Sequence, residues 1–176
     1  IYDEGLKVFS STPPQIDSFP LSQIYRKNGT NLNCSRHLSL FQKYNIIPEF
    51  CFGCYKVQVQ PRTVLELIKI FLLFDQIILE KNNIRKCMVE LRPDIPGFYK
   101  SLIYCSGLEE AISISKTLDD KLKQLISLDL SSEIKHGCSE YANAFPLYKK
   151  IDRTGPQNFT YKEEWRQIEA KYDHLN

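Results

Sequence analysis

The chain has 176 residues, of which 25% are charged and 43% are apolar, and its formal net charge is +2. A chain of this length fits one ordinary domain and can bury a core of its own. The nearly neutral charge excludes a uniformly basic or acidic surface, but it neither requires nor excludes a nucleic-acid partner, since a basic patch can lie within a balanced total.

No segment has the pattern of a secretory signal or a membrane span. The most apolar run, LELIKIFLLFDQIIL at residues 65–79, is too short to cross a bilayer and is interrupted by charges, so we expect a buried helix and no membrane partner. Cys87 and Cys105 lie in apolar runs typical of buried thiols, which favours a reducing, cytoplasmic location over a disulfide framework. The chain starts at Ile1 rather than at a methionine, which indicates processing or a longer parent chain.

The N-terminal third has no regular period. Residues 1–33 carry the turn-forming stretches STPPQ and RKNGTN, which predicts an irregular arm that packs over the rest of the molecule. Residues 34–54 follow, with a short amphipathic segment, HLSLFQKYNII, between two pairs of possible metal ligands.

These pairs are Cys34-x-x-His37 and Cys51-x-x-Cys54. Two ligands at this spacing reach one ion when a tight turn brings their side chains to the same side, and Gly53 favours such a turn. Thiolates and imidazole suit zinc, and four protein ligands leave no position for a reactive water. We therefore predict a structural zinc bound by all four residues, which tethers the arm to the first strand.

Other interpretations of these pairs stay open. Cys51 and Cys54 could be buried core thiols with His37 at the surface, or the set could hold an iron–sulfur cluster. A redox dithiol of the thioredoxin kind is disfavoured, because CFGC precedes a predicted strand rather than following one.

From Tyr55 onward the pattern becomes regular and predicts alternating strands and helices. The predicted elements are a strand at 55–60, a helix of about 15 residues opened by the capping box Thr63-x-x-Glu66, strands at 85–92 and 99–105, a helix over about 107–127 opened by Ser106-x-x-Glu109, and a fourth strand in SSEIKHGCSEY. The apolar stripes expected to face the sheet are Val64, Leu67, Ile68, Phe71 and Leu72 on the first helix, and Leu108, Ala111, Ile112, Leu118, Leu122 and Leu125 on the second.

This β-α-β-β-α-β order predicts an α+β, ferredoxin-like fold: a four-stranded antiparallel sheet with both helices on one face. The predicted organisation is a zinc-tethered arm over 1–54, a ferredoxin-like domain over 55–140, and a C-terminal extension over 141–176. In the extension, Thr160-x-x-Glu163 caps a short helix that carries Trp165 and Ile168.

The other face of the sheet is a candidate binding surface. Strand alternation places a mixed, basic-leaning set of side chains there: Lys56, Gln58, Lys86, Arg92 and Tyr104. We predict that this face or the arm–sheet junction binds a protein or a small ligand, unless the face is solvated or covered by residues 1–33. Nucleic acid is an alternative partner, but the strands lack the aromatic signature of RNA-recognition sheets.

An enzyme is the second alternative. His136-Gly-Cys138 could supply a cysteine nucleophile with a histidine partner, since residues two apart on a strand point to the same face. No third orienting group is evident, and the same three residues also suit a second metal-ligand pair or a strand end followed by a turn glycine.

Three segments, CFGCYKVQVQPRTVLELIKIF, RKCMVELRPDIPGFYKSLIYCSGLEEA and IKHGCSEYANAFP, resemble a domain that follows the repeats in uncharacterised tetratricopeptide-repeat proteins of marine bacteria. The resemblance covers roughly residues 30–172 and brings no known activity or functional residue. It implies an assembly or targeting module beside helical repeats, which are themselves binding solenoids. Together, the sequence predicts a non-catalytic interaction or ligand-binding module stabilised by a structural zinc.

Overall fold

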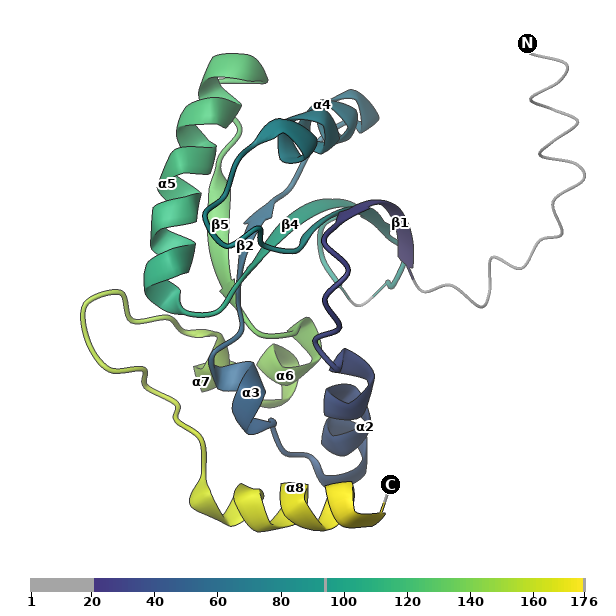
Figure 1. Cartoon of the computed structure of the whole chain (residues 1–176), viewed down its shortest axis with the longest axis vertical. Helices are drawn as coiled ribbons and strands as arrows, with labels where there is room; N and C mark the ends of the chain where they lie inside the picture. The colour runs from purple at the N-terminus through teal and green to yellow at the C-terminus, as the bar shows by residue number, and fades with distance from the viewer. Residues whose placement is uncertain (1–20, 94, 176) are drawn as a thin grey trace, which may run out of the picture.

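The protein has an α+β fold with one five-stranded antiparallel sheet and several helices (Figure 1). The computed structural model describes residues 21–93 and 95–175, so most of the predicted 1–33 arm lies outside the described residues. The elements in chain order are β1 (Leu21–Lys27), α2 (Cys34–Tyr44), α3 (Glu49–Phe52), β2 (Tyr55–Val59), α4 (Val64–Gln76), β3 (Arg85–Glu90), β4 (Tyr99–Cys105), α5 (Leu108–Leu125), β5 (Ser132–His136), α6 (Ser139–Ala144), α7 (Pro146–Lys149) and α8 (Glu163–Leu175).

The strands lie in the order β1-β3-β4-β2-β5, and every neighbouring pair is antiparallel. The sheet therefore differs from the predicted four-stranded ferredoxin-like sheet, because β1 adds a fifth strand at the edge beside β3. The prediction of an irregular arm over 1–54 was wrong for its described part, which forms β1, α2 and α3. Tyr55 of β2 pairs with both Cys105 and His136, which fixes the register of β2 between β4 and β5.

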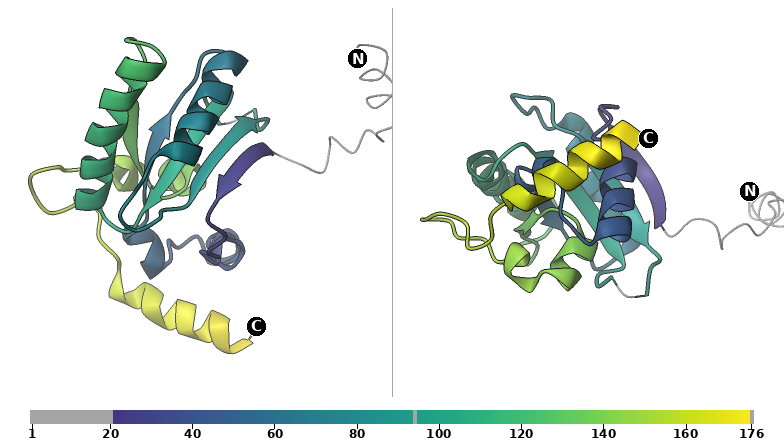
Figure 2. Two further views of the ribbon diagram at one scale, coloured as in Figure 1. Left: turned by 45° about the horizontal axis from the view of Figure 1, so that its top comes forward. Right: turned by 90° about the horizontal axis from the view of Figure 1, so that it is seen from below.

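Helices α4 and α5 pack side by side on one face of the sheet (Figures 1 and 2). The main core lies between these helices and the inward side chains of the strands, including Val57, Cys87 and Ile103, which are fully buried. Buried residues on the two helices are Leu67, Ile70, Leu73 and Phe74 of α4 and Ala111, Ile114, Leu118 and Leu122 of α5.

The predicted apolar stripes were only partly right. On α4, Val64, Ile68 and Leu72 are exposed rather than buried. Because α4 is apolar on nearly every side, its sequence alone does not determine which face the sheet covers. On α5, Ile112 and Leu125 are likewise exposed.

One of the two predicted capping boxes before the main helices is confirmed. At the start of α4 the hydroxyl of Thr63 accepts a hydrogen bond from the backbone N–H of Glu66 at 3.2 Å. At the start of α5 the residue that bonds back to Ser106 is Glu110 rather than the predicted Glu109, and the cap position is Gly107.

Arg85 of β3 joins the sheet to the end of α4. Its side chain is buried, and its guanidinium donates hydrogen bonds to the carbonyl oxygens of Phe74 and Ile77. Burial lowers the pKa of Arg85.

A second, smaller core lies at the end of the molecule that holds α2, α3, α6, α7 and α8 (Figure 1). Its buried members are Leu40, Ile46, Ile47, Cys51, Tyr141, Tyr148 and Trp165. The predicted C-terminal helix with Trp165 is present as α8, and Arg36 of α2 forms ion pairs with its Glu169 and Asp173. The N-terminal helices and the C-terminal extension therefore share one core. Among the described residues, none of the helices is both long and apolar enough to cross a bilayer.

Candidate functional site

The predicted metal ligands lie where the N-terminal helices meet the sheet. Cys34 is the first residue of α2 and is exposed, whereas His37, one turn later, is buried. Cys51 lies in α3 and is buried, and Cys54 directly precedes β2. The backbone N–H of Cys54 donates to the carbonyl oxygen of Cys51 at 3.2 Å, so the CFGC segment forms the tight turn that its spacing predicts.

His37 packs on an aromatic ring and lies near charged groups of α2 and α8. Its ring stacks on Phe50 with the ring centroids 5.2 Å apart. Burial, and then the charge of Arg36, lowers the pKa of His37, while Glu169 and Asp173 of α8 oppose the shift. Within residues 21–93 and 95–175, no three or more His, Cys, Asp or Glu side chains are arranged to hold a metal ion. The four-ligand set with His37 is not gathered in this structure and stays a prediction.

Three residues of that set are cysteines, and a fourth cysteine, Cys138, directly precedes α6. Burial raises the pKa of Cys34, and the neighbouring Cys138 raises it further. Burial also raises the pKa of Cys54, against the effect of Lys56, and both Cys138 and Cys34 add to the rise. Burial raises the pKa of Cys51 to about 12, with contributions from Cys138 and Cys54. The fold also links these residues: the backbone N–H of Gly137 donates to the carbonyl oxygen of Cys54 at 2.8 Å, and Cys34 and Cys138 line the same cavity. We call Cys34, Cys51, Cys54 and Cys138 the cysteine cluster.

A buried positive charge lies beside this cluster. Lys56 of β2 is 8% exposed, its Nζ donates to the carbonyl oxygen of Gly137 at 2.9 Å, and the same atom lies 3.5 Å from Sγ of Cys138. The ring of Tyr104 lies 5.1 Å from this Nζ. Lys56 forms no ion pair with a carboxylate in the described part of the chain.

His136, the predicted catalytic partner of Cys138, occupies a structural position. Its ring is stacked between Tyr55 and Tyr148, with centroid distances of 4.4 and 4.0 Å. Both ring nitrogens lie 3.0 Å from backbone carbonyl oxygens, Nδ1 from that of Tyr148 and Nε2 from that of Phe52. Burial lowers the pKa of His136. Because both nitrogens are engaged, the ring is not hydrogen-bonded to the Cys138 thiol, and the enzyme alternative gains no support from this geometry.

The residues predicted for the binding face do share one side of the sheet. They line a cavity of about 220 Å³ together with side chains from α2 and α6, and its walls include Lys56, Gln58, Lys86, Arg92, Tyr104, Cys34, Leu38, Cys138 and Glu140. This face is therefore partly covered, not open as predicted, and Lys56 and Gln58 are buried.

Carboxylates neutralise much of the charge on this face. Glu90 accepts hydrogen bonds from Arg92 at 2.8 Å and from Lys100 at 3.2 Å, and Arg92 also pairs with Glu140. Burial, and then Lys56 and Lys100, lowers the pKa of Lys135 to about 8. A face with paired charges and buried lysines offers few free cations to a phosphate backbone, which weakens the nucleic-acid alternative.

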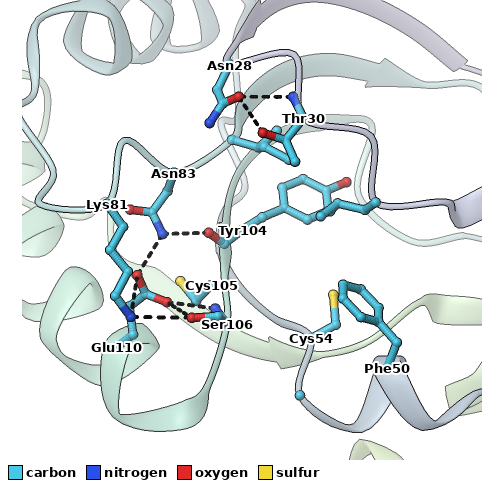
Figure 3. Close-up of a pocket in the computed structure, with 13 residues that line it drawn as sticks. Asn28, Thr30, Phe50, Cys54, Lys81, Asn83, Tyr104, Cys105, Ser106 and Glu110 are labelled. Atoms are coloured by element: carbon cyan, nitrogen blue, oxygen red, sulfur yellow. Dashed lines mark hydrogen bonds and ion pairs between the residues drawn. The ribbon is translucent and has the colours of Figure 1, made fainter.

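A larger cavity, of about 440 Å³, lies at the junction between the N-terminal segment, α3 and the end of β4 (Figure 3). We call it the junction cavity, and its lining residues are Asn28, Thr30, Leu32, Phe50, Gly53, Cys54, Lys81, Asn83, Ile84, Tyr104, Cys105, Ser106 and Glu110. Its walls are mostly apolar. In Figure 3, Phe50 and Cys54 lie across the cavity from Glu110 and Lys81.

One group of polar side chains in the junction cavity surrounds Glu110, and a second, formed by Asn28 and Thr30, lies apart from it (Figure 3). Glu110 accepts hydrogen bonds from Asn83 Nδ2 at 2.9 Å and from the backbone N–H of Ser106 at 2.7 Å, and Lys81 pairs with it at 3.8 Å. Asn83 Nδ2 also donates to the carbonyl oxygen of Tyr104 at 2.8 Å, which fixes the amide orientation. Oδ1 of Asn83 is buried and has no hydrogen-bond partner among the described residues.

Sequence reasoning missed most of these residues. The sequence pattern gives Asn83 no role, and the predicted capping box names Glu109 rather than Glu110. The lining comes from four separate parts of the chain, residues 28–32, 50–54, 81–84 and 104–110, so no local motif marks the cavity. The one usable signal was the pair of asparagines before the second predicted strand, because a buried amide beside a strand usually has a specific partner.

Comparisons with known proteins give this chain no relative from which to argue. The predicted resemblance to repeat-associated bacterial domains therefore stays a prediction, and the case for function rests on the site geometry. No family model, no curated protein and no solved structure matches the chain.

Proposed function

We propose that this protein is a non-catalytic ligand-binding module, that its ligand occupies the junction cavity, and that a structural zinc stabilises the wall of that cavity. The observation that carries the proposal is the cavity itself. Its volume of about 440 Å³ falls within the roughly 300–1,000 Å³ range of small-molecule sites, and a mostly apolar wall with a few convergent polar groups is typical of them.

The lining indicates the chemistry of the ligand. Leu32, Phe50 and Ile84 offer apolar contacts, and the ring of Tyr104 offers a stacking surface. Glu110 and Lys81 supply one acceptor and one donor at a single end. A small, largely apolar molecule with a polar group that reaches Glu110 and Lys81 fits this lining.

The zinc proposal is supported by the tight CFGC turn and by the position of Cys54, which lines the junction cavity and directly precedes β2. A metal at this turn would hold α3 against the sheet and so fix one wall of the ligand site. All six cysteines are free thiols, which supports a reducing, cytoplasmic compartment.

We further propose that the inner four strands form a ferredoxin-like unit to which β1 is an added edge. The order β5-β2-β4-β3 and the two helical connections, β2 to β3 through α4 and β4 to β5 through α5, support this proposal. Both helices pack on the same core.

The test is a ligand-observed NMR screen with small aromatic and aliphatic amides and alcohols. The Leu32→Trp variant fills the junction cavity, and Leu128→Trp is the matched control because Leu128 is 80% exposed and lies outside the cavity lining. We expect compounds that bind the wild type and Leu128→Trp, and that lose binding to Leu32→Trp. Equal binding to all three proteins, or no binding by any compound at millimolar concentration, would contradict the proposal.

A further inference from the structure

We propose that the cysteine cluster binds one zinc ion through its four thiolates, with Lys56 as the buried counter-charge. This inference rests on the structural zinc of the proposed function and changes its ligand set. Cys138 takes the place that the sequence assigned to His37.

The backbone places Cys138 beside the CFGC turn. The N–H of Gly137 donates to the carbonyl oxygen of Cys54 at 2.8 Å, which continues the pairing of β2 with β5 by one residue. Gly137 then adopts a positive φ of 54°, and the chain turns into α6 with Cys138 at its start. A strand-end turn of this kind brings a thiol next to a Cys-x-x-Cys pair although more than 80 residues separate them in the chain.

The fourth thiol comes from the start of α2. Cys34 lines the same sheet-face cavity as Lys56 and Cys138. It is exposed, so its side chain is free to turn inward. A Cys-x-x-Cys turn joined by two single cysteines at the starts of helices gives four sulfur ligands, which is a common donor set for closed, tetrahedral zinc.

On the opposite side of the turn, two tyrosines hold Cys51 in place. Tyr148 Oη donates to the carbonyl oxygen of Cys51 at 2.6 Å, and the Cys51 thiol lies 3.7 Å from Tyr141 Oη. In the structure the Cys51 thiol contacts Tyr141 and the Cys138 thiol contacts Lys56, and no three of the thiols are in ligand geometry. Binding would turn the four sulfur atoms toward one another and break the contact of Cys51 with Tyr141.

The charges support this donor set. A zinc ion with four thiolates has a net charge of −2, and four protons leave the thiols when it forms, with no change of oxidation state. A buried ammonium without a carboxylate partner is costly. Lys56, which already contacts Cys138, offsets one of the two negative charges, as outer-shell groups commonly do around metal sites.

His37 is poorly placed for the same ion. It is buried against Phe50, and the charged groups that act on it belong to α2 and α8. The residue before it, Arg36, forms ion pairs with Glu169 and Asp173, which hold this part of α2 against α8.

The decisive experiment compares the zinc affinities of Cys138→Ser and His37→Gln. Each variant is purified as the full chain and titrated with zinc against a competing chelator. Cys87→Ala, which removes a thiol from the main core, is the control. We expect one zinc per chain in the wild type, His37→Gln and Cys87→Ala. Cys138→Ser should lose more than the roughly 100-fold in affinity that removal of an outer-shell group costs, and Lys56→Met should lose roughly 10- to 100-fold.

A second measurement covers the case in which Cys138→Ser fails to fold. Mass spectrometry after alkylation of the wild type, with and without zinc, counts the thiols that the ion protects, and Cys34 and Cys138 should be protected only with zinc. Cobalt in place of zinc should give the absorption of a four-thiolate site, which Cys138→His should shift.

Three results would overturn the inference: zinc lost in His37→Gln but kept in Cys138→Ser, iron in place of zinc, or no metal in any variant. The last result would also remove the zinc from the proposed function. The junction cavity is tested separately by the NMR screen, so the two failures are distinguishable.

Discussion

Arg85 donates a hydrogen bond to the carbonyl oxygen of Phe74, so a strand side chain closes the last turn of a neighbouring helix. The last carbonyl groups of a helix have no partner within the helix, and they carry partial negative charge. A buried guanidinium at this point supplies these carbonyl groups with both hydrogen-bond donors and a positive charge. The contact also fixes how α4 meets β3. It therefore positions Asn83 and Ile84, which lie between these two elements in the chain and line the junction cavity.

Arg85→Met should destabilise the protein by about 3 kcal/mol, because the carbonyl groups of Phe74 and Ile77 would lose a buried charged donor. Arg85→Lys should lose less, since an ammonium keeps the charge and reaches at least one carbonyl. Urea unfolding at neutral pH measures both. If Arg85→Met were as stable as the wild type, the cost of burying the charge would equal the gain from the helix cap.

Acid should weaken the ion-pair network on the sheet face. Burial alone would raise the pKa of Glu90, but hydrogen bonds from Arg92 and Lys100 lower it from 4.5 to about 2. Because the folded-state pKa lies below the unfolded one, the stabilisation is complete above about pH 4.5 and is lost as pH falls toward 2. We expect this group alone to account for about 2 kcal/mol over that window.

Urea unfolding at a series of pH values tests this expectation. Glu90→Gln should be less stable at pH 6 and should depend less on pH between 5 and 2 than the wild type. Glu109→Gln, which changes an exposed carboxylate, is the control and should keep the wild-type slope. If the free energy of unfolding of Glu90→Gln depended on pH as steeply as that of the wild type, other carboxylates would govern acid unfolding.

Gly137→Ala should destabilise the protein by about 3 kcal/mol. Gly137 has a φ of 54°, and a Cβ there would lie 2.0 Å from the hydroxyl oxygen of Tyr148, which is buried and hydrogen-bonded to Cys51. Gly29→Ala is the matched control, because a Cβ at Gly29 meets nothing within 4 Å. Thermal melts of the two variants should differ clearly, and equal melting temperatures would mean that the turn relaxes at no cost.

The ion pair between Arg36 and Glu169 should contribute a coupling energy of about 1 kcal/mol, because both side chains are largely shielded from solvent. A double-mutant cycle with Arg36→Gln and Glu169→Gln measures it. The exposed pair Arg166–Glu163 of α8 is the comparison and should give a coupling energy near zero. A value below about 0.3 kcal/mol for the buried pair would show that packing alone holds α2 to α8.

The sequence predicts the central elements well because their signals are local. The strand predicted at 99–105 coincides with β4, and the strict alternation of YKVQV marks β2. Thr63 and Glu66 locate the start of α4 by hydrogen bonds between residues three apart. Such contacts are decided by neighbouring residues, so a short stretch of sequence contains them.

The missed features depend on distant residues. The strand β1 is recognisable only through its partner β3, since an edge strand buries little and needs no strong alternation. The buried face of α4 is chosen by the sheet beneath it. At the candidate site, close spacing predicts His37 as a ligand, whereas Cys138, the ligand that we propose instead, follows a strand that pairs with β2 and is more than 80 residues from the CFGC turn.

The shared core of the N-terminal helices and α8 also has a consequence for synthesis. Arg36 and Glu169 are 133 residues apart in the chain, so α2 leaves the ribosome long before its partner exists. Until α8 is made, the apolar side chains of Leu40 in α2 and of Ile46 and Ile47 after it are not fully packed. Folding of the smaller core should therefore finish only after α8 has been synthesised, by closure of a very long loop, and until then α2 exposes apolar side chains that chaperones can shield.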